Sequence, residues 1–342
     1  MCPMWLAALS LCTIGSASSI GSLRPNTPSD SGLEFYKLVA YPWNIRELPS
    51  CFNPALCPPE ANYTWDYYFD QLFDLGVKRF VMGGYSVTKS RIKVDPPFYR
   101  PWNKSGFSAL KSRVESEGGK ILTALEVYAD DNFNKTAFAE SVAEFIRDYP
   151  VDGFRVSYLP GFPIPPRKQI LEAVNEMGMT SALWFDPVGS TATFQPSDWE
   201  IVDKSGLGRV ADINFVPLTP MNNEDITVFS TDRFAEEIIA NAIRAGINPD
   251  TLVLHIPLLA ESIDGENGVG YSNAIFDMRG DPQGDGSVAN FRFFSQPRAI
   301  DKIELARKHG LRGIALQASY DMSADLYPWD RRSLCYALAT NV

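Results

Sequence analysis

The chain has 342 residues, of which 45% are hydrophobic and 12% aromatic, so it can bury a large core and is neither disordered nor fibrous. Its formal net charge of −10 at pH 7 argues against nucleic acid or another polyanion as a partner. Neutral ligands are compatible with this charge.

The N-terminal segment, residues 1–19, has an apolar run followed by small residues and predicts a secretory signal peptide cleaved near Ala17. Residues 20–32 are rich in Ser and Pro, without periodicity, and predict a flexible leader. The apolar run is too short to anchor the chain, and no later stretch approaches the roughly 20 apolar residues of a membrane span. We therefore expect a secreted protein without a membrane span.

Cysteines and glycosylation motifs fit an exported chain. Cys51 and Cys57 bracket a short loop and are close enough in sequence to pair, whereas Cys335 is left over and expected to be buried in the last helix. Three Asn-X-Ser/Thr motifs are compatible with glycosylation, at Asn62, Asn103 and Asn134.

Short apolar runs alternate with helical patterns along residues 33–342. The predicted strands are 35–41, 77–82, 120–127, 151–157, 179–185, 210–218, 251–257 and 313–319. The predicted helices are 65–75, 107–116, 135–149, 167–176, 198–204, 231–245, 297–309 and 331–339. This alternation predicts one α/β domain with a (β/α)8 TIM barrel fold.

A long insertion, residues 258–296, separates the seventh strand from its helix and is rich in Gly, Asp and Asn. In a barrel it belongs to the face where the strands' carboxyl ends lie. Its composition favours a flexible surface loop.

The segment VDGFRVSYLP, residues 151–160, resembles the fourth strand of glycoside hydrolase family 18, the chitinase family, which is written D-G-x-D-x-D-x-E. Asp152 and Gly153 match, but the three later acidic positions hold Arg155, Ser157 and Leu159. In that family the Glu is the general acid, and the Asp before it orients the substrate's acetamido group. The resemblance implies a chitinase-like barrel without the family's catalytic residues.

The resemblance extends over most of the mature chain, and other landmarks differ from the family in the same way. Thr219-Pro220 stand where the family has Tyr-Asp after the sixth strand. Gln317 stands where the family has a Trp that forms the bottom of the sugar-binding site. The barrel pattern is retained while the functional positions differ.

Other strand-end carboxylates are candidates for catalysis, because a barrel enzyme can draw its acid and base from several strands. These are Glu126, Asp130, Asp186, Glu261 and Asp321. Because side chains along a strand point alternately to its two faces, Glu126 is expected on the inward face of its strand, next to the strand that carries Arg155. An ion pair of Glu126 with Arg155 is the favoured interpretation, and catalytic use of Glu126 is the alternative.

Aromatic residues near strand ends suggest sugar binding, because the apolar faces of sugars lie against aromatic rings. With Gln317, the candidates are Tyr41, Trp43, Tyr128, Tyr158, Trp184 and Tyr320. Trp43 and Tyr128 are the strongest of these. The alternative for each ring is packing between the barrel and its helices.

Metal and cofactor sites are not indicated. His255 and His309 are the two histidines, and neither has a His or Cys partner at zinc spacing. The sequence has no G-x-S-x-G elbow, Walker loop or dinucleotide-binding glycine pattern.

Three functions remain open. The leading hypothesis is a secreted chitinase-like pseudoenzyme that binds a neutral oligo- or polysaccharide containing N-acetylglucosamine. The second is an active glycosidase with a relocated acid, from Glu126, Asp186, Asp321 or another strand-end carboxylate. The third is an exported interaction or inhibitor protein that uses the barrel as a scaffold.

Overall fold

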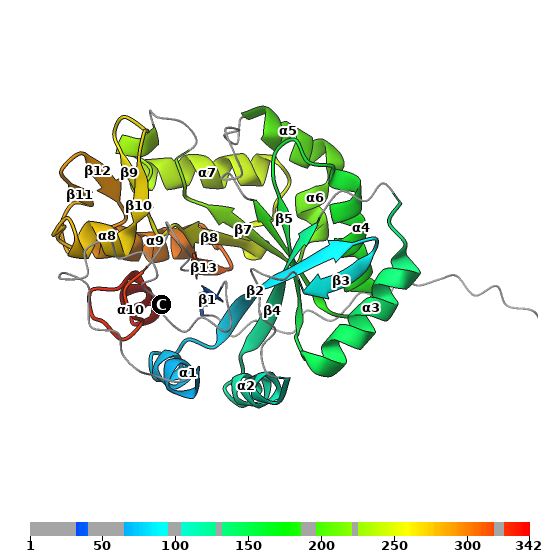
Figure 1. Cartoon of the computed structure of the whole chain (residues 1–342). Helices are drawn as coiled ribbons and strands as arrows, with labels where there is room; N and C mark the ends of the chain where they lie inside the picture. The colour runs from blue at the N-terminus through cyan, green and yellow to red at the C-terminus, as the bar shows by residue number, and fades with distance from the viewer. Residues whose placement is uncertain are drawn as a thin grey trace, which may run out of the picture. The chain divides into compact units, whose positions relative to one another are not determined.

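Eight strands form a closed parallel barrel in the computed structural model, which describes residues 32–39, 65–94, 104–127, 132–185, 196–220, 225–317 and 325–342 (Figure 1). They are β1 (Glu34–Val39), β2 (Arg79–Thr88), β4 (Lys120–Val127), β5 (Gly153–Tyr158), β6 (Thr180–Phe185), β7 (Ile213–Pro217), β8 (Leu252–Ile256) and β13 (Gly313–Leu316). They pair in the order β1-β13-β8-β7-β6-β5-β4-β2, and β1 pairs with β2 to close the ring. The predicted (β/α)8 barrel is confirmed.

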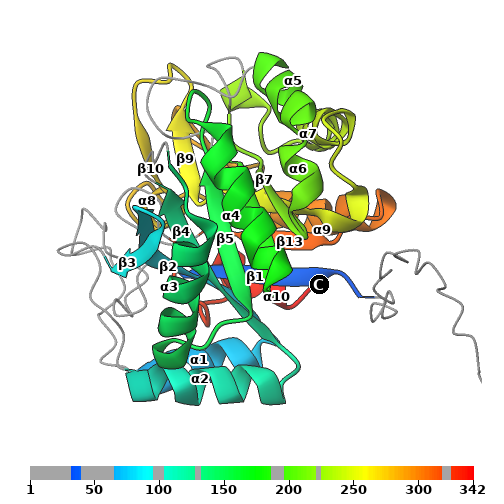
Figure 2. The same cartoon turned by 90° about the vertical axis from the view of Figure 1, so that its right-hand side faces the viewer.

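Helices surround the strands, as both views show (Figures 1 and 2). Helix α7 (Asp232–Arg244) illustrates why they form: it buries one face made of Phe234, Ala235, Ile238, Ile239 and Ala242. The others are α1 (Trp65–Asp74), α2 (Lys104–Ser116), α3 (Lys135–Asp148), α4 (Ile164–Glu176), α5 (Pro196–Ser205), α6 (Leu207–Val210), α9 (Gln296–Lys308) and α10 (Leu334–Ala339), with 3-10 turns η1 (Asp225–Thr227) and η2 (Pro249–Thr251).

Side chains along each strand point alternately into the barrel and out toward the helices, which creates two separate cores. Inward residues fill the barrel with a small cluster: Tyr36, Leu38, Val81, Leu122, Ala182, Ile213, Phe215, Val253 and Ala315. Outward residues of the same strands, such as Phe154 and Val156, join the larger core beneath the helices. The side chains that reach the mouth of the barrel are therefore fixed by their position in each strand.

The retained Asp152-Gly153 pair has a structural role at the start of β5. One Asp152 carboxylate oxygen accepts the Ile121 N–H at 2.7 Å and the other lies 2.8 Å from the Lys111 ammonium. A Cβ on Gly153 would lie 1.9 Å from the carbonyl oxygen of Thr180. The pair thus fixes the approach of β5 to its neighbours β4 and β6.

Strand β2 extends beyond the predicted end of the strand, and the chain after it turns back to form a hairpin. Its register shifts between Met82 and Tyr85, and its end pairs antiparallel with β3 (Arg91–Val94). The predicted strand ended at Met82, because Gly83-Gly84 interrupts the apolar run. The bulge accommodates these glycines within the strand.

The insertion is folded, so the prediction of a flexible loop was wrong. Strands β9 (Leu259–Ser262), β10 (Gly268–Gly270), β11 (Ser287–Val288) and β12 (Phe291–Phe293) form an antiparallel sheet in the order β10-β9-β12-β11, next to α8 (Tyr271–Phe276). Phe293 and Tyr271 are buried with ring centroids 5.8 Å apart. Asp281 and Asp285 accept N–H bonds from Gln283 and Ser287, as turn residues do.

Some predictions about export concern residues outside those that the structure describes: the signal peptide, the leader, Cys51, Cys57, Asn62 and Asn103. Cys335 is buried in α10, as predicted. Asn134 is exposed and caps α3 by accepting the Ala137 N–H. In the described part of the chain, no helix has the length and apolar character to cross a bilayer.

Candidate functional site

The inward face of β5 carries the residues that replace the family's acidic positions. Arg155 and Ser157 are 5% and 1% exposed. The Arg155 guanidinium lies 4.3 Å from the centre of the Trp184 ring, and its Nη2 lies 3.6 Å from Glu126 Oε1. The predicted ion pair of Arg155 with Glu126 is confirmed.

Glu126 is held by two donors at the end of β4. Besides Arg155, the Ser157 hydroxyl donates to its Oε1 at 3.1 Å. Its side chain is 40% exposed, so one side of the carboxylate faces solvent. This arrangement is that of a structural ion pair at the barrel mouth, in which Glu126 offsets the charge of the buried arginine.

Trp184 and His255 lie beside Arg155 in the barrel. Their ring centroids are 5.6 Å apart at an interplanar angle of 72°. His255 is 1% exposed, and burial together with the charges of Arg155 and Lys37 lowers its pKa to about 3. His255 is therefore an uncharged hydrogen-bonding group at neutral pH. From the sequence, His255 was a candidate only for metal binding; the alternation of inward and outward side chains along β8 was the one signal that places it inside the barrel.

Arg167 on α4 connects the carboxyl ends of β4 and β5 through hydrogen bonds. Its guanidinium donates to the carbonyl oxygens of Ser157 at 2.8 Å, Pro163 at 2.7 Å and Val127 at 3.1 Å. It also lies 5.4 Å from the ring centre of Phe162, which is 47% exposed in the turn after β5. Neither residue was singled out from the sequence; for Phe162, its place after a barrel strand was the available signal.

Gln317 lies at the end of β13, where the prediction placed it, and it holds the insertion to the barrel. Its side-chain oxygen accepts the Leu258 N–H at 2.8 Å, and its carbonyl oxygen lies 3.5 Å from the Lys37 ammonium. The Gln317 amide oxygen is thus engaged in joining β13 to the segment that leads into β9.

Tyr158 requires a correction as a sugar-contact candidate. It is 1% exposed and belongs to the outer core, with its ring 6.2 Å from that of Phe185. The alternation of β5 turns Tyr158 away from the inward face of Arg155 and Ser157. Several other candidates lie outside the described residues: Tyr41, Trp43, Tyr128, Tyr320, Asp130, Asp186 and Asp321.

Glu261 lies on β9 in the insertion, three residues beyond Leu258. It pairs across the sheet with Gly268 and Arg292, and a Cβ on Gly268 would lie 3.3 Å from its carboxylate. Burial raises the pKa of Glu261 to about 7. A carboxyl group of this kind is protonated for part of the physiological pH range and can donate a proton.

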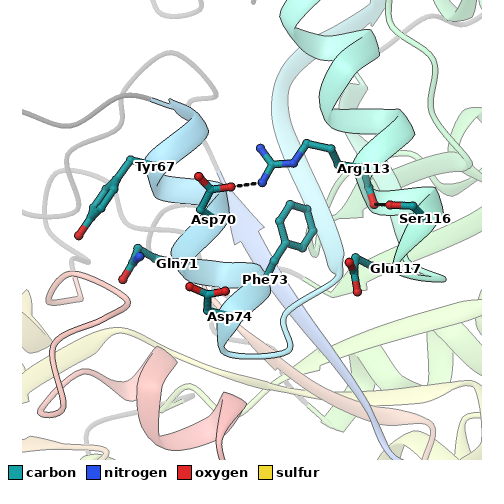
Figure 3. Close-up of a pocket in the computed structure, with 8 residues that line it drawn as sticks. All are labelled: Tyr67, Asp70, Gln71, Phe73, Asp74, Arg113, Ser116 and Glu117. Carbon is teal, nitrogen blue, oxygen red and sulfur yellow. Dashed lines mark hydrogen bonds and ion pairs between the residues drawn. The ribbon is translucent and has the colours of Figure 1, made fainter.

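A pocket of about 510 Å³ lies between α1 and α2, outside the barrel (Figure 3). Its lining runs along α1 from Tyr67 to Asp74 and includes Arg113, Ser116 and Glu117 at the end of α2. Within it Arg113 pairs with Asp70 and covers the Phe73 ring at 4.9 Å. The pocket is therefore separate from the barrel mouth.

No cluster of three or more His, Cys, Asp or Glu side chains is arranged for a metal ion among the residues that the structure describes. The groups gathered at the mouth are instead a guanidinium, an indole, an imidazole, hydroxyls and a paired carboxylate. They can bind a polar, uncharged ligand through hydrogen bonds and ring contacts.

No profile of a known protein family matches the sequence, and no curated protein matches it either. Solved structures do match it. A glycoside hydrolase family 18 N-acetylglucosaminidase of Paenibacillus barengoltzii has a TM-score of 0.60 and 14% identity, covering 91% of this chain and 100% of its own. A Group IV chitinase of Ostrinia furnacalis has a TM-score of 0.60 and 15% identity, covering 91% and 98%.

A family 18 chitinase of Flavobacterium johnsoniae has a TM-score of 0.56 and 12% identity, covering 90% of this chain and 93% of its own. Identities this low establish a common fold and not a common activity. The chain has the (β/α)8 barrel fold found in the chitinases of glycoside hydrolase family 18.

Proposed function

We propose that the protein binds a neutral glycan containing N-acetylglucosamine at the mouth of its barrel and does not hydrolyse it by the family 18 mechanism. The observation that carries the proposal is Arg155, which occupies an acidic position of the family motif, lies inside the barrel and is paired with Glu126. The fold of the neighbouring chitinases supports the ligand class.

Loss of hydrolysis follows from the side chains in β5 and directly after it. Leu159, at the position of the family's general acid, cannot protonate a glycosidic oxygen. Ser157, at the position that orients the acetamido group, carries no charge to stabilise a cationic intermediate, and its hydroxyl donates to Glu126. Both parts of substrate-assisted catalysis are therefore missing from this strand.

Retained binding follows from the partly exposed Trp184 ring and the hydrogen-bonding groups around it. We expect wild-type protein to bind a soluble chitooligosaccharide in calorimetry, and Trp184→Ala to weaken binding by about tenfold, because ring contacts contribute roughly 1 kcal/mol or more. Tyr67→Ala is the matched control, because Tyr67 is an exposed aromatic residue on α1. Equal affinities in all three proteins would contradict glycan binding at the mouth.

An active glycosidase with a relocated acid is the second candidate, and Glu261 favours it. Its raised pKa is the property that a general acid needs, whereas Glu126 is occupied by Arg155 and Ser157. If this candidate is correct, any turnover should disappear in Glu261→Gln and persist in Glu126→Gln. An absence of both turnover and glycan binding would favour the third function, a scaffold for interaction with another protein.

Glu261 also predicts a dependence of stability on pH. Because its pKa is about 7 in the folded protein and near 4.5 when exposed, the folded state binds the extra proton between these values. Its contribution to the free energy of unfolding is therefore present below pH 4.5 and lost as the pH rises through 7. Chemical denaturation should show that Glu261→Gln removes this decline, and parallel curves for the two proteins would contradict the prediction.

We further propose that the protein is secreted after removal of residues 1–19, which the apolar segment at its start supports. Expression of the full chain in a secreting host should yield protein in the medium whose first residue lies between Ser18 and Ile20. Protein that stays in the cell with residue 1 intact would contradict secretion.

A further inference from the structure

Three polar side chains at the barrel mouth have buried atoms without a hydrogen-bond partner among the described residues. These atoms are Trp184 Nε1, Thr219 Oγ1 and both ring nitrogens of His255. They come from β6, from the segment just after β7, and from β8, which are neighbours in the barrel. Their clustering on adjacent strands is the basis of the inference.

The register of these strands brings the three residues to the same end of the barrel. Trp184 pairs with Phe215 on β7, and Pro217 on β7 pairs with His255. Thr219 follows Pro217 by two residues, and the intervening Leu218 N–H donates to the His255 carbonyl at 2.9 Å. Because parallel strands share their carboxyl end, all three lie where barrel proteins bind ligands.

Leaving a buried donor or acceptor unpaired destabilises the folded state, because the group loses its hydrogen bonds to water. Thr219 is 6% and His255 1% exposed, so bulk solvent does not reach them. On the outer face of β6 the Ser181 hydroxyl is satisfied, because it accepts the Asp212 N–H at 3.0 Å, whereas on the outer face of β7 the Asn214 side-chain oxygen is unpaired although its amide nitrogen donates to the Gly208 carbonyl. The fold itself gains nothing from the unpaired atoms, which points to a role in binding.

We infer that Trp184, Thr219 and His255 form a hydrogen-bonding subsite for an uncharged hydroxyl or amide group of the ligand, an inference that rests on the proposed glycan binding. The indole N–H can only donate, whereas the threonine hydroxyl and a neutral imidazole can each donate and accept. A carboxylate cannot donate to the accepting ring nitrogen, and an ammonium group cannot accept from the indole. A hydroxyl or amide group does both.

The three groups of the subsite are themselves uncharged. Burial and the nearby charges of Arg155 and Lys37 lower the pKa of His255 and keep its ring neutral, and Glu126 offsets the guanidinium of Arg155. The His255 ring lies against the partly exposed Trp184 ring. The subsite thus lies deeper than the ring contact that Trp184 provides, and it selects the polar substituent that a sugar presents to the barrel interior.

The test compares calorimetric binding of a soluble chitooligosaccharide to wild-type protein and to three variants. His255→Leu and Thr219→Val remove polar atoms at a similar side-chain size, and Trp184→Phe removes the indole N–H but leaves a smaller ring. We expect each variant to bind about tenfold more weakly, as loss of one hydrogen bond of roughly 1.4 kcal/mol implies. His255→Asn, which keeps a donor and an acceptor, should bind closer to wild type. Without ligand, His255→Leu and Thr219→Val should unfold at the same temperature as wild type or higher, because unpaired groups are removed.

Wild-type affinity in all the size-matched variants would overturn the subsite and leave glycan binding intact, and it would mean that buried water satisfies these groups. Lower thermal stability in His255→Leu and Thr219→Val without ligand would also overturn it, because the polar atoms would then serve the fold. If wild-type protein binds no chitooligosaccharide, the proposed function fails and the inference fails with it. Binding of the chitooligosaccharide by wild-type protein therefore distinguishes failure of the subsite alone from failure of the proposed function.

Discussion

Gly153→Ala is expected to destabilise the barrel by about 3 kcal/mol or more, or to prevent folding. The added methyl group would lie 1.9 Å from the carbonyl oxygen of Thr180 and 2.8 Å from the Thr180 side chain. The obstacle is the backbone of the neighbouring strand β6, which cannot rotate away as a side chain would. The clash can be removed only if β5 and β6 move apart. This movement would strain the hydrogen bond from the Thr180 N–H to the Asp152 carbonyl oxygen, which joins the chain at this point.

Denaturant unfolding of the purified variant measures this loss. Gly32→Ala serves as its control, because a Cβ at Gly32 meets no atom within 4 Å. An unchanged midpoint for Gly153→Ala would show that the strand spacing is not fixed there. In that case Gly153, the second residue of the retained Asp-Gly pair, would need an explanation other than close packing.

Arg167→Ala is expected to lower the free energy of unfolding by about 3 kcal/mol or more, because it removes a 2% exposed guanidinium that donates to three carbonyl oxygens. Val127 and Ser157 would lose their partner at the ends of β4 and β5. Glycan binding should weaken as well, because Glu126 and Ser157 lie at these strand ends. Thermal unfolding and calorimetry on the same sample measure the two effects.

Arg167→Lys separates charge from geometry. A lysine keeps the positive charge but not the planar fork of N–H groups that reaches three acceptors, so we expect it to restore only part of the stability. Arg233→Ala is the control, because the Arg233 side chain is 82% exposed on α7. Full stability in Arg167→Lys would show that charge alone suffices at this position.

The barrel could be predicted from the sequence because each strand is a short apolar run bounded by turn residues, and each helix has a regular apolar face. Strands β9, β11 and β12 could not, because they have two to four residues and pair across a Gly- and Asp-rich stretch. The two hairpins of this sheet are joined by a pairing between segments that are distant in the chain, because β9 pairs with β12 and Ser262 opposes Phe291. Local periodicity contains no information about such contacts.

Part of the site was also predictable. Alternation alone placed Arg155 and Glu126 on facing inward positions, and the need to offset a buried charge predicted their ion pair. The same alternation puts Tyr158 on the outer face, so its selection as a sugar-contact candidate was wrong. The unpaired nitrogens of His255 could not be predicted, because absence of a partner depends on every neighbouring strand and not on local sequence.

The central claim is that a chitinase-like barrel with Arg155, Ser157 and Leu159 in the acidic positions does not hydrolyse its ligand by substrate-assisted catalysis. The most direct test is release of the fluorophore from a fluorogenic chitobioside or chitotrioside by purified protein across the acid to neutral range. The account predicts no release above the buffer blank, in a preparation that binds chitooligosaccharide. Release by wild-type protein that is lost in Glu261→Gln or Glu126→Gln would contradict the account and show an enzyme whose acid has moved to another strand.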